Sequence, residues 1–185
     1  MSRLQQLNPE SATGNVQTLF NAIKTNLGMV PNMMRLLGNS PSALEGYLQL
    51  NSSLTKGSLT GQQREQIALA VAEANGCDYC LAAHSTLGRM VGLSADQIRD
   101  SRQSVAVDSK TNTLLQFVHK IVEQRGHVDD HDVSGMRDAG FSDGDITEVV
   151  VNVALSLLTN YFNIVADTVV DFPKAPPLTA AVAVN

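Results

Sequence analysis

Two cysteines and a histidine form a cluster whose residue types and spacing suit redox or metal chemistry. Cys77 and Cys80 are the only cysteines among the 185 residues, two residues separate them, and His84 follows four positions later. Cysteines at this spacing in an intracellular protein cycle between dithiol and disulfide, or they supply half of a metal site. What the cluster does therefore depends on the role of the histidine.

On one helix, all three side chains would share a face. At about 100° per residue, Cys77 and His84 lie about 20° apart around the axis, and Cys80 lies about 60° from Cys77. Cys77 in the first turn would feel unpaired amide N–H groups and the helix dipole, which favour a thiolate. His84 stands one turn after Cys80 and can take its proton directly or through one water. Each sulfur is thus a candidate nucleophile, and the offset of three residues also permits a short disulfide between them.

A carboxylate that holds the imidazole would make His84 a better base, and the preceding segment offers Glu65 and Glu73. A tight turn at Asn75-Gly76 separates the two helical patterns, so the helix that carries Glu65 is expected to pack against the cysteine helix. We expect the Glu65 carboxylate to reach His84. The alternative is that Glu65 is only a solvated residue favoured by the helix dipole.

Apolar spacing and capping residues predict an all-α fold. No segment alternates apolar and polar residues convincingly, and Asn75-Gly76 lies between helical patterns instead of joining two strands. Ser40-Pro41, the pair Thr60 and Gln63, and Ser142 predict helix starts. The predicted helices lie near 19–27, 31–37, 41–50, 60–75, from 77 onward, 95–100, 108–124, 129–139 and 143–168.

Composition limits the class of protein. With 43% hydrophobic residues, 17% charged residues and a net charge of −5, we expect one soluble domain without a nucleic-acid or membrane partner. The apolar stretch 146–158 is shorter than the roughly 20 residues of a spanning helix and is predicted to be a buried helix. The N-terminal residues have no apolar core typical of a secretion signal, so a cytoplasmic location with reduced thiols is expected.

Two further alternatives concern the cysteine cluster itself. A zinc site built from Cys77, Cys80, His84 and Glu65 would lack the second ligand pair usual for structural zinc. Burial of the two cysteines as simple hydrophobic residues is the other alternative.

Other clusters are interpreted as structural. The acidic and histidine-containing run 127–132 is interpreted as helix capping. Three of the six methionines, Met29, Met33 and Met34, are expected to fill gaps between helices or at an interface. We therefore expect no metal and no bound cofactor.

The segment from Glu65 to His84 resembles the alkylhydroperoxidase AhpD-like group within the carboxymuconolactone decarboxylase superfamily. Glu65, eleven intervening residues, Cys77-Asp78-Tyr79-Cys80 and then His84 have the spacing of that group. Segments 28–32, 160–163 and 171–173 are also similar and point to its peroxidase-related subgroup. The resemblance implies an AhpD-like helical fold, here divided into an N-terminal helical extension (1–58), a core (59–172) and an extended tail (173–185), assembled into homotrimers or hexamers.

The resemblance also implies roles for four residues in reducing hydroperoxides. Cys80 would be the peroxidatic thiolate, Cys77 the resolving thiol, His84 the base and Glu65 the group that polarises it. The helix dipole favours Cys77 instead, but a base within hydrogen-bonding distance should outweigh a dipole effect of roughly 1 kcal/mol. Tyr79 stands where some members of the group have a histidine, and it is interpreted as a packing residue.

The leading hypothesis is a cysteine-dependent peroxidase that an external dithiol restores. A protein disulfide reductase that serves a partner peroxiredoxin would use the same residues, and exposure of the disulfide separates the two. A lactone-acid decarboxylase would need His84 and Glu65 but not two thiols. A non-enzymatic thiol redox sensor or oligomerisation module would show no turnover.

Overall fold

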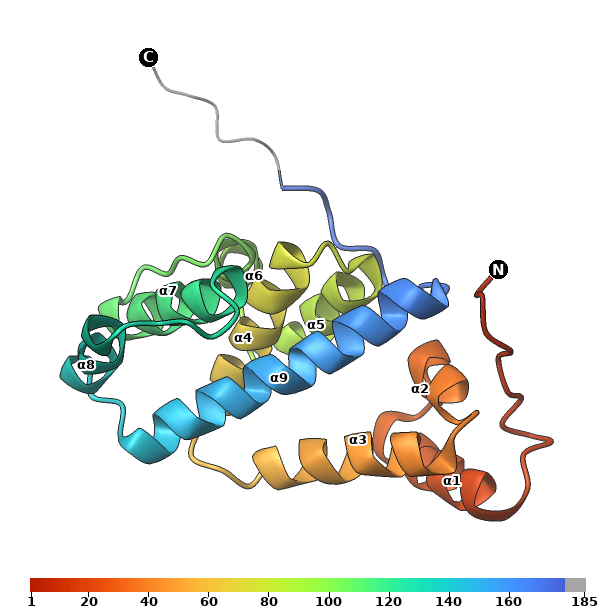
Figure 1. Ribbon diagram of the computed structural model, residues 1–185. Helices are drawn as coiled ribbons and strands as arrows, with labels where there is room; N and C mark the ends of the chain where they lie inside the picture. The colour runs from red at the N-terminus through yellow and green to blue at the C-terminus, as the bar shows by residue number, and fades with distance from the viewer. Residues whose placement is uncertain (179–185) are drawn as a thin grey trace.

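Nine α-helices and no strand make up the regular structure of residues 1–178, the part of the chain that the computed structural model describes (Figure 1). The all-α prediction is confirmed. The predicted tail 173–185 lies partly outside the described residues. The helices are α1 (Gly14–Leu27), α2 (Asn32–Leu37), α3 (Pro41–Leu54), α4 (Gly61–Ala74), α5 (Asp78–Met90), α6 (Ala95–Arg102), α7 (Ser109–Glu123), α8 (Asp130–Asp138) and α9 (Asp143–Ala166).

The three helix starts predicted from capping residues are present. Ser40 accepts a hydrogen bond from the Ala43 amide at the start of α3. Capping boxes start α4 and α9: Thr60 pairs with Gln63 in the first, and Ser142 pairs with the aspartate three residues later in the second. Each box satisfies two amide groups that a helix start otherwise leaves unpaired. Local sequence therefore determines where two of the core helices, α4 and α9, begin.

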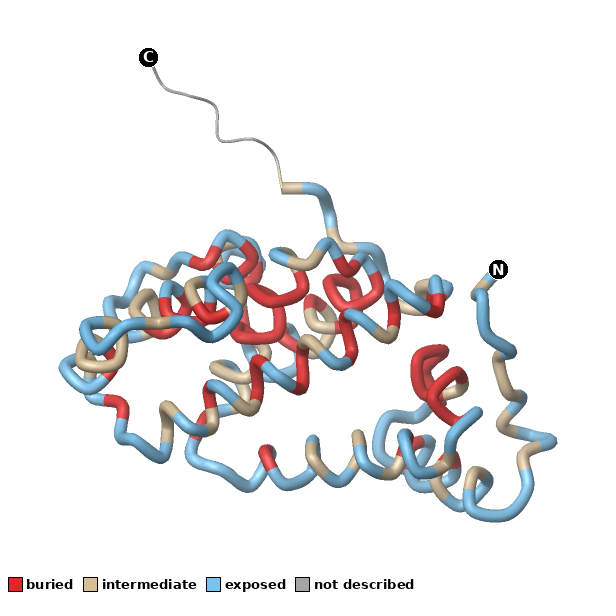
Figure 2. Tube along the Cα trace, viewed as in Figure 1, coloured by how far each residue is buried: buried red, intermediate tan, exposed pale blue. Residues whose placement is uncertain are grey.

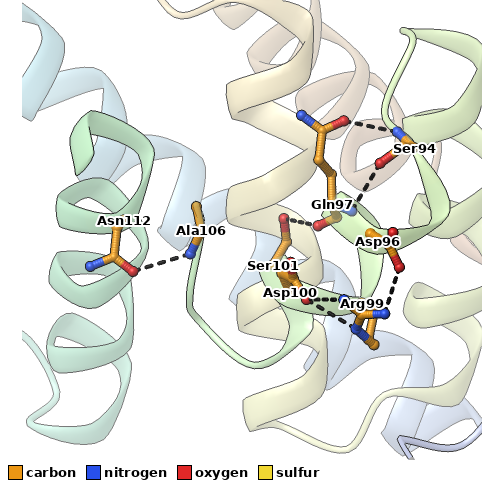
Figure 3. Close-up of polar contacts among 8 residues, drawn as sticks. All are labelled: Ser94, Asp96, Gln97, Arg99, Asp100, Ser101, Ala106 and Asn112. Atoms are coloured by element: carbon orange, nitrogen blue, oxygen red, sulfur yellow. Dashed lines mark hydrogen bonds and ion pairs between the residues drawn. The ribbon is translucent and has the colours of Figure 1, made fainter. Parts of the chain in front are cut away.

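Helix α6 shows the same local logic on a strongly polar segment (Figure 3). Ser94 and Gln97 form a capping box, and the Arg99 guanidinium donates to Asp96 at 2.5 Å and to Asp100 at 2.7 Å. These ion pairs are largely exposed and contribute little stability. The cap and the burial of Ile98 account for the helix. It ends at Arg102, two residues beyond the predicted end.

Helix α4 occupies the centre of the core and packs against α5, α6, α7 and α9. Its residues 66–72 are all buried (Figure 2). One apolar cluster joins α4 to α7, α8 and α9, and a second joins α1, α2 and α3 to α5 and contains both cysteines. The cysteine helix thus lies between the core and the N-terminal helices.

Helix α9 runs along the length of the molecule and contacts α4 and α5 as well as α3 (Figure 1). It is long and apolar enough to cross a membrane, yet half of the residues in its most apolar 18-residue stretch are buried inside the protein. Asn152, Asn160 and Asn163 are among its buried residues. We therefore describe α9 as a core helix. The helix ends at Ala166, two residues before the predicted end near Thr168, because Asp167 adopts a left-handed conformation with φ of 49°.

The N-terminal helices are joined to the C-terminal segment beside α5. The backbone amide of Asn32, at the start of α2, donates to the Asp171 carboxylate at 2.8 Å, and its side chain donates to the Val169 carbonyl at 2.9 Å. All but one of the residues of α2 are buried. This junction brings segments from both ends of the chain next to the cysteines.

Candidate functional site

Cys77 and Cys80 form a disulfide at the start of α5. Cys77 is the N-cap residue, and its sulfur accepts a hydrogen bond of 3.3 Å from the Cys80 amide. The two Cα atoms are 5.3 Å apart, which is within the ordinary range for a disulfide. Only 1% of Cys77 and 2% of Cys80 is exposed. The expected dithiol–disulfide geometry is therefore present, and the pair is buried.

His84 and Glu65 are paired as their positions on adjacent helices predict. The Nδ1 atom of His84 lies 2.8 Å from Oε2 of Glu65. Because an ionised carboxylate can only accept, Nδ1 carries the hydrogen of this bond and Nε2 keeps the basic lone pair. Glu73, the other candidate, accepts instead from Arg102 at 2.7 Å. Helix α4 therefore presents Glu65 to the cysteine helix and turns Glu73 towards α6.

A cavity of about 390 Å³ opens beside the disulfide, and both Cys80 and His84 line it. Cys77 is absent from its walls, so the two sulfurs are not equivalent. The apolar part of the wall comes from α1, α2, α5 and the C-terminal segment and comprises Leu27, Met29, Pro31, Met33, Met34, Ala83, Leu87, Met90, Phe172 and Pro173. A bound molecule would meet Cys80 and the imidazole within a mostly apolar chamber.

Asn163 of α9 also contacts the Cys80 sulfur. Its side-chain Nδ2 donates to Cys80 Sγ at 3.3 Å, although 83 residues separate the two positions. The Asn163 side chain is buried, and its Oδ1 has no hydrogen-bond partner among the described residues. An amide donor favours a thiolate over a thiol, and a buried unpaired oxygen is a ready acceptor for a bound molecule.

Tyr79, between the cysteines, does more than pack. Its hydroxyl accepts a hydrogen bond of 3.2 Å from the Met33 amide, and its ring meets Phe172 edge-on with centroids 5.8 Å apart. Burial and the nearby Asp171 carboxylate raise the pKa of Tyr79, against the opposing effect of the Met33 bond. The neutral hydroxyl therefore links α5 to α2 at the wall of the cavity.

Tyr47 of α3 is the other tyrosine of the cavity wall. Burial, followed by the negative charge of Glu65, raises its pKa to about 12. Tyr47 therefore stays protonated in the neutral range and keeps a hydroxyl donor near the Glu65–His84 pair.

Sequence reasoning missed Tyr47, Asn163 and the cavity itself. The methionines expected to fill gaps, Met33 and Met34, are buried in the apolar cluster but also form part of the cavity wall. A signal for Asn163 was available, because an asparagine on the buried side of an apolar helix requires a partner. No local pattern identifies that partner as a sulfur on another helix.

The run 127–132 brings three candidate ligands together on the surface. Single ligand atoms of Asp129, His131 and Asp132 lie within 4.8 Å of one another. Asp129 caps α8 by accepting from the Asp132 amide, and Asp132 is paired with Lys120. These contacts fit the capping role expected from the sequence.

Solved structures of other proteins share this fold. An uncharacterised peroxidase-related AhpD-core protein of Ralstonia eutropha JMP134 aligns with a TM-score of 0.81 at 23% identity, covering 92% of each chain. A peroxidase-related protein of Silicibacter sp. TM1040 aligns at 0.77 and 22% identity, covering 91% of this chain and 94% of that one. The debrominase Bmp8, as a cysteine-to-alanine variant bound to 2,3,4-tribromopyrrole, aligns at 0.79 and 16% identity, covering 92% of each.

One family profile matches part of the chain. No curated protein matches the chain. Residues 41–123 match the profile of the Carboxymuconolactone decarboxylase family, and this segment contains Glu65, both cysteines and His84. The segment that carries the candidate site is therefore similar to the carboxymuconolactone decarboxylase family, and the chain has the helical fold of the AhpD-like, peroxidase-related structures.

Proposed function

We propose that this protein is a cysteine-dependent peroxidase that reduces organic hydroperoxides through a Cys77–Cys80 redox disulfide. One observation carries the proposal: Cys80 and His84 line the same apolar cavity, and Glu65 holds the imidazole with Nε2 free. This geometry supports a thiol and a base that act together beside a chamber suited to an apolar molecule.

The reaction balances through the two thiols. His84 takes the Cys80 proton, and the thiolate attacks the terminal peroxide oxygen, so that the O–O bond breaks and the alkoxide leaves as an alcohol after taking a proton. Cys80 is then a sulfenic acid. Cys77 attacks that sulfur, forming the disulfide and releasing water. A dithiol reductant returns two electrons and is itself oxidised to a disulfide.

The remaining parts of the proposal follow from this chemistry. The thiols supply both electrons, so the cycle as proposed uses no metal, haem or flavin. Reduced thiols are its starting state, which suits a cytoplasmic location. Its partners are a hydroperoxide and an external dithiol reductant.

Burial of the disulfide favours a small substrate over a protein one. Cys77 and Cys80 are almost inaccessible, and a folded peroxiredoxin would have to bring its own disulfide to a buried sulfur. This supports a peroxidase over a reductase that serves a partner peroxiredoxin. Two thiols joined as a disulfide are not required by lactone decarboxylation, which argues against that alternative.

Reductive dehalogenation is the second candidate. The apolar walls of the cavity beside Cys80 favour it, and the debrominase Bmp8, which binds 2,3,4-tribromopyrrole, shares the fold. In this chemistry the dithiol becomes a disulfide while a carbon–bromine bond is replaced by carbon–hydrogen, and bromide and a proton leave. Release of bromide from a bromopyrrole by the reduced protein would distinguish this candidate from the peroxidase.

Stoichiometric oxidation tests the peroxidase directly. The reduced protein, Cys80→Ser and Cys77→Ser are mixed anaerobically with cumene hydroperoxide, and free thiols and remaining peroxide are measured. The native protein should lose two thiols per peroxide consumed, and Cys80→Ser should react at the background rate. The proposal would be refuted if the native protein kept both thiols free after mixing, or if Cys80→Ser consumed the peroxide as rapidly as the native protein.

A second copy of the chain is proposed to cover the outer face of α9. This face carries exposed apolar side chains at helical spacing, namely Val150, Leu158, Tyr161 and Val165. Side chains of this kind, aligned on one helix, are typical of interfaces. The arrangement supports the homotrimer or hexamer that the family resemblance implies.

A further inference from the structure

Two cavities adjoin the disulfide, and each is lined by only one of the two cysteines. Cys80 lines the apolar cavity, whereas Cys77 lines a hollow of about 360 Å³. The walls of this hollow include the charged residues Arg3, Asp78 and Asp167. Asn163 belongs to the walls of both. Each cysteine of the disulfide therefore adjoins a cavity that the other does not line.

We propose that the two half-reactions use these two sides: the hydroperoxide reaches Cys80 through the apolar cavity, and the reducing thiol reaches Cys77 through the charged hollow. The inference rests on the proposed function. A thiolate attacks a disulfide in line with the S–S bond, from the side opposite to the sulfur that leaves. Attack on Cys77 must therefore come from the side away from Cys80, and the hollow is a cavity that Cys77 lines and Cys80 does not.

The leaving group supports the same direction. The reductant's sulfur bonds to Cys77, the Cys77–Cys80 bond breaks, and its electron pair stays on Cys80. The departing thiolate lies beside the Asn163 amide, 3.3 Å from its sulfur, and takes a proton from the His84 imidazolium or from water. Stabilising the leaving thiolate speeds disulfide exchange. The reductant's second thiol then displaces Cys77 as a thiol and closes the reductant's own disulfide.

The hollow also limits the shape of the reductant. Cys77 is 1% exposed, so a thiol has to enter the hollow to reach it. The rim is held in place by the N-terminal segment, because the Arg3 amide donates to the Ala166 carbonyl at 2.7 Å and its guanidinium donates to Val165 at 3.0 Å. A slender aliphatic thiol fits this route better than a thiol on the flat surface of a folded protein.

Trapping of the mixed disulfide tests which sulfur is attacked. Protein oxidised with diamide is mixed briefly with 2-mercaptoethanol, quenched in acid, alkylated with N-ethylmaleimide and analysed by tandem mass spectrometry. We expect mercaptoethanol on Cys77 and maleimide on Cys80. The reverse pattern would overturn the inference. The proposed function requires that hydroperoxides oxidise the protein. This experiment does not, because diamide forms the disulfide chemically, and the two proposals can therefore fail separately.

Blocking each side separately tests the two routes. Ile164 lines only the hollow, Met90 lines only the apolar cavity, and both side chains are exposed. We expect Ile164→Trp to slow reduction by 2-mercaptoethanol roughly tenfold, through loss of access, with oxidation by cumene hydroperoxide almost unchanged. Met90→Trp should do the opposite. The control Val107→Trp, at a fully exposed loop position that lines neither cavity, should change neither; equal effects of both blocking variants on both half-reactions would contradict separate routes.

Discussion

At the scale of single residues, the site combines a buried disulfide with groups that act on one sulfur more than on the other. Asn163 donates to Cys80, and the Glu65–His84 pair lies in the wall of the cavity that Cys80 faces. Cys77 is stabilised differently, by the Cys80 amide at the helix start. Cys77 does lie at the start of the helix, as the dipole argument requires, and Cys80 does lie near the histidine, as the base argument requires. The cavity, which Cys80 lines and Cys77 does not, favours Cys80 as the sulfur that a hydroperoxide would reach.

Glu65→Gln tests the pairing of the imidazole. Loss of the carboxylate removes the group that fixes the His84 tautomer, so oxidation of the reduced protein by cumene hydroperoxide should slow roughly 10- to 100-fold. Glu73→Gln, on the same helix but paired with Arg102, is the matched control and should react like the native protein. Equal rates for Glu65→Gln and the native protein would mean that the pair does not assist the reaction.

The raised pKa of Tyr47 predicts that the free energy of unfolding decreases at alkaline pH. Its pKa is raised to about 12, above the value of about 10 in an unfolded chain, so the folded state holds the proton more tightly. This stability is fully present below pH 10 and is lost as the pH rises towards 12. Urea unfolding at pH 9, 10 and 11 should therefore show a smaller decline for Tyr47→Phe than for the native protein. Parallel declines would contradict the raised pKa.

At the scale of elements, the structure shows which features local sequence determines. The capping residues Ser40, Thr60 and Ser142 predicted three helix starts correctly, because each acts on amides within its own first turn. The expected Glu65–His84 contact is also present, because a tight turn forces α4 and α5 together. Asn163 and Tyr47 come from α9 and α3, and their contact with the site depends on long-range packing that no local spacing encodes.

Asn163→Leu tests what α9 contributes to the site. Removing the amide should lower the rate at which iodoacetamide alkylates Cys80 of the reduced Cys77→Ser protein roughly tenfold at neutral pH, since a hydrogen bond to a charged group contributes about 1.5 kcal/mol. Asn152→Leu changes a buried asparagine about three turns earlier on the same helix, whose side chain donates to the Glu148 carbonyl, and should leave the alkylation rate unchanged. Unchanged alkylation in Asn163→Leu would show that the amide does not stabilise the thiolate.

At the scale of the whole molecule, segments far apart in the chain complete one chamber. Helices α1 to α3 supply part of the cavity wall and the C-terminal residues Asp171, Phe172 and Pro173 another part. The N-terminal segment expected to pack on the core therefore also encloses the site. The opposite side of α9 leaves an apolar face exposed, for which we propose a second copy of the chain.

Charge placed on that face should disrupt the assembly. Tyr161 and Val165 are 57% and 66% exposed, so Tyr161→Glu with Val165→Lys should preserve the fold while weakening an apolar interface. Sedimentation velocity should show a lower mass than for the native protein. The control Val107→Glu changes a fully exposed loop residue and should keep the native mass. A native protein that sediments as a monomer would contradict the proposed assembly.

The central claim, that Cys80 is the thiolate that hydroperoxides oxidise, is tested most directly by trapping its sulfenic acid. Reduced Cys77→Ser and Cys80→Ser are mixed with one equivalent of cumene hydroperoxide in the presence of dimedone, and the adducts are located by mass spectrometry. The account predicts a dimedone adduct on Cys80 in Cys77→Ser, formed at the rate at which the native protein loses its thiols, and little adduct on Cys77 in Cys80→Ser. A faster adduct on Cys77, or none on either cysteine, would contradict it.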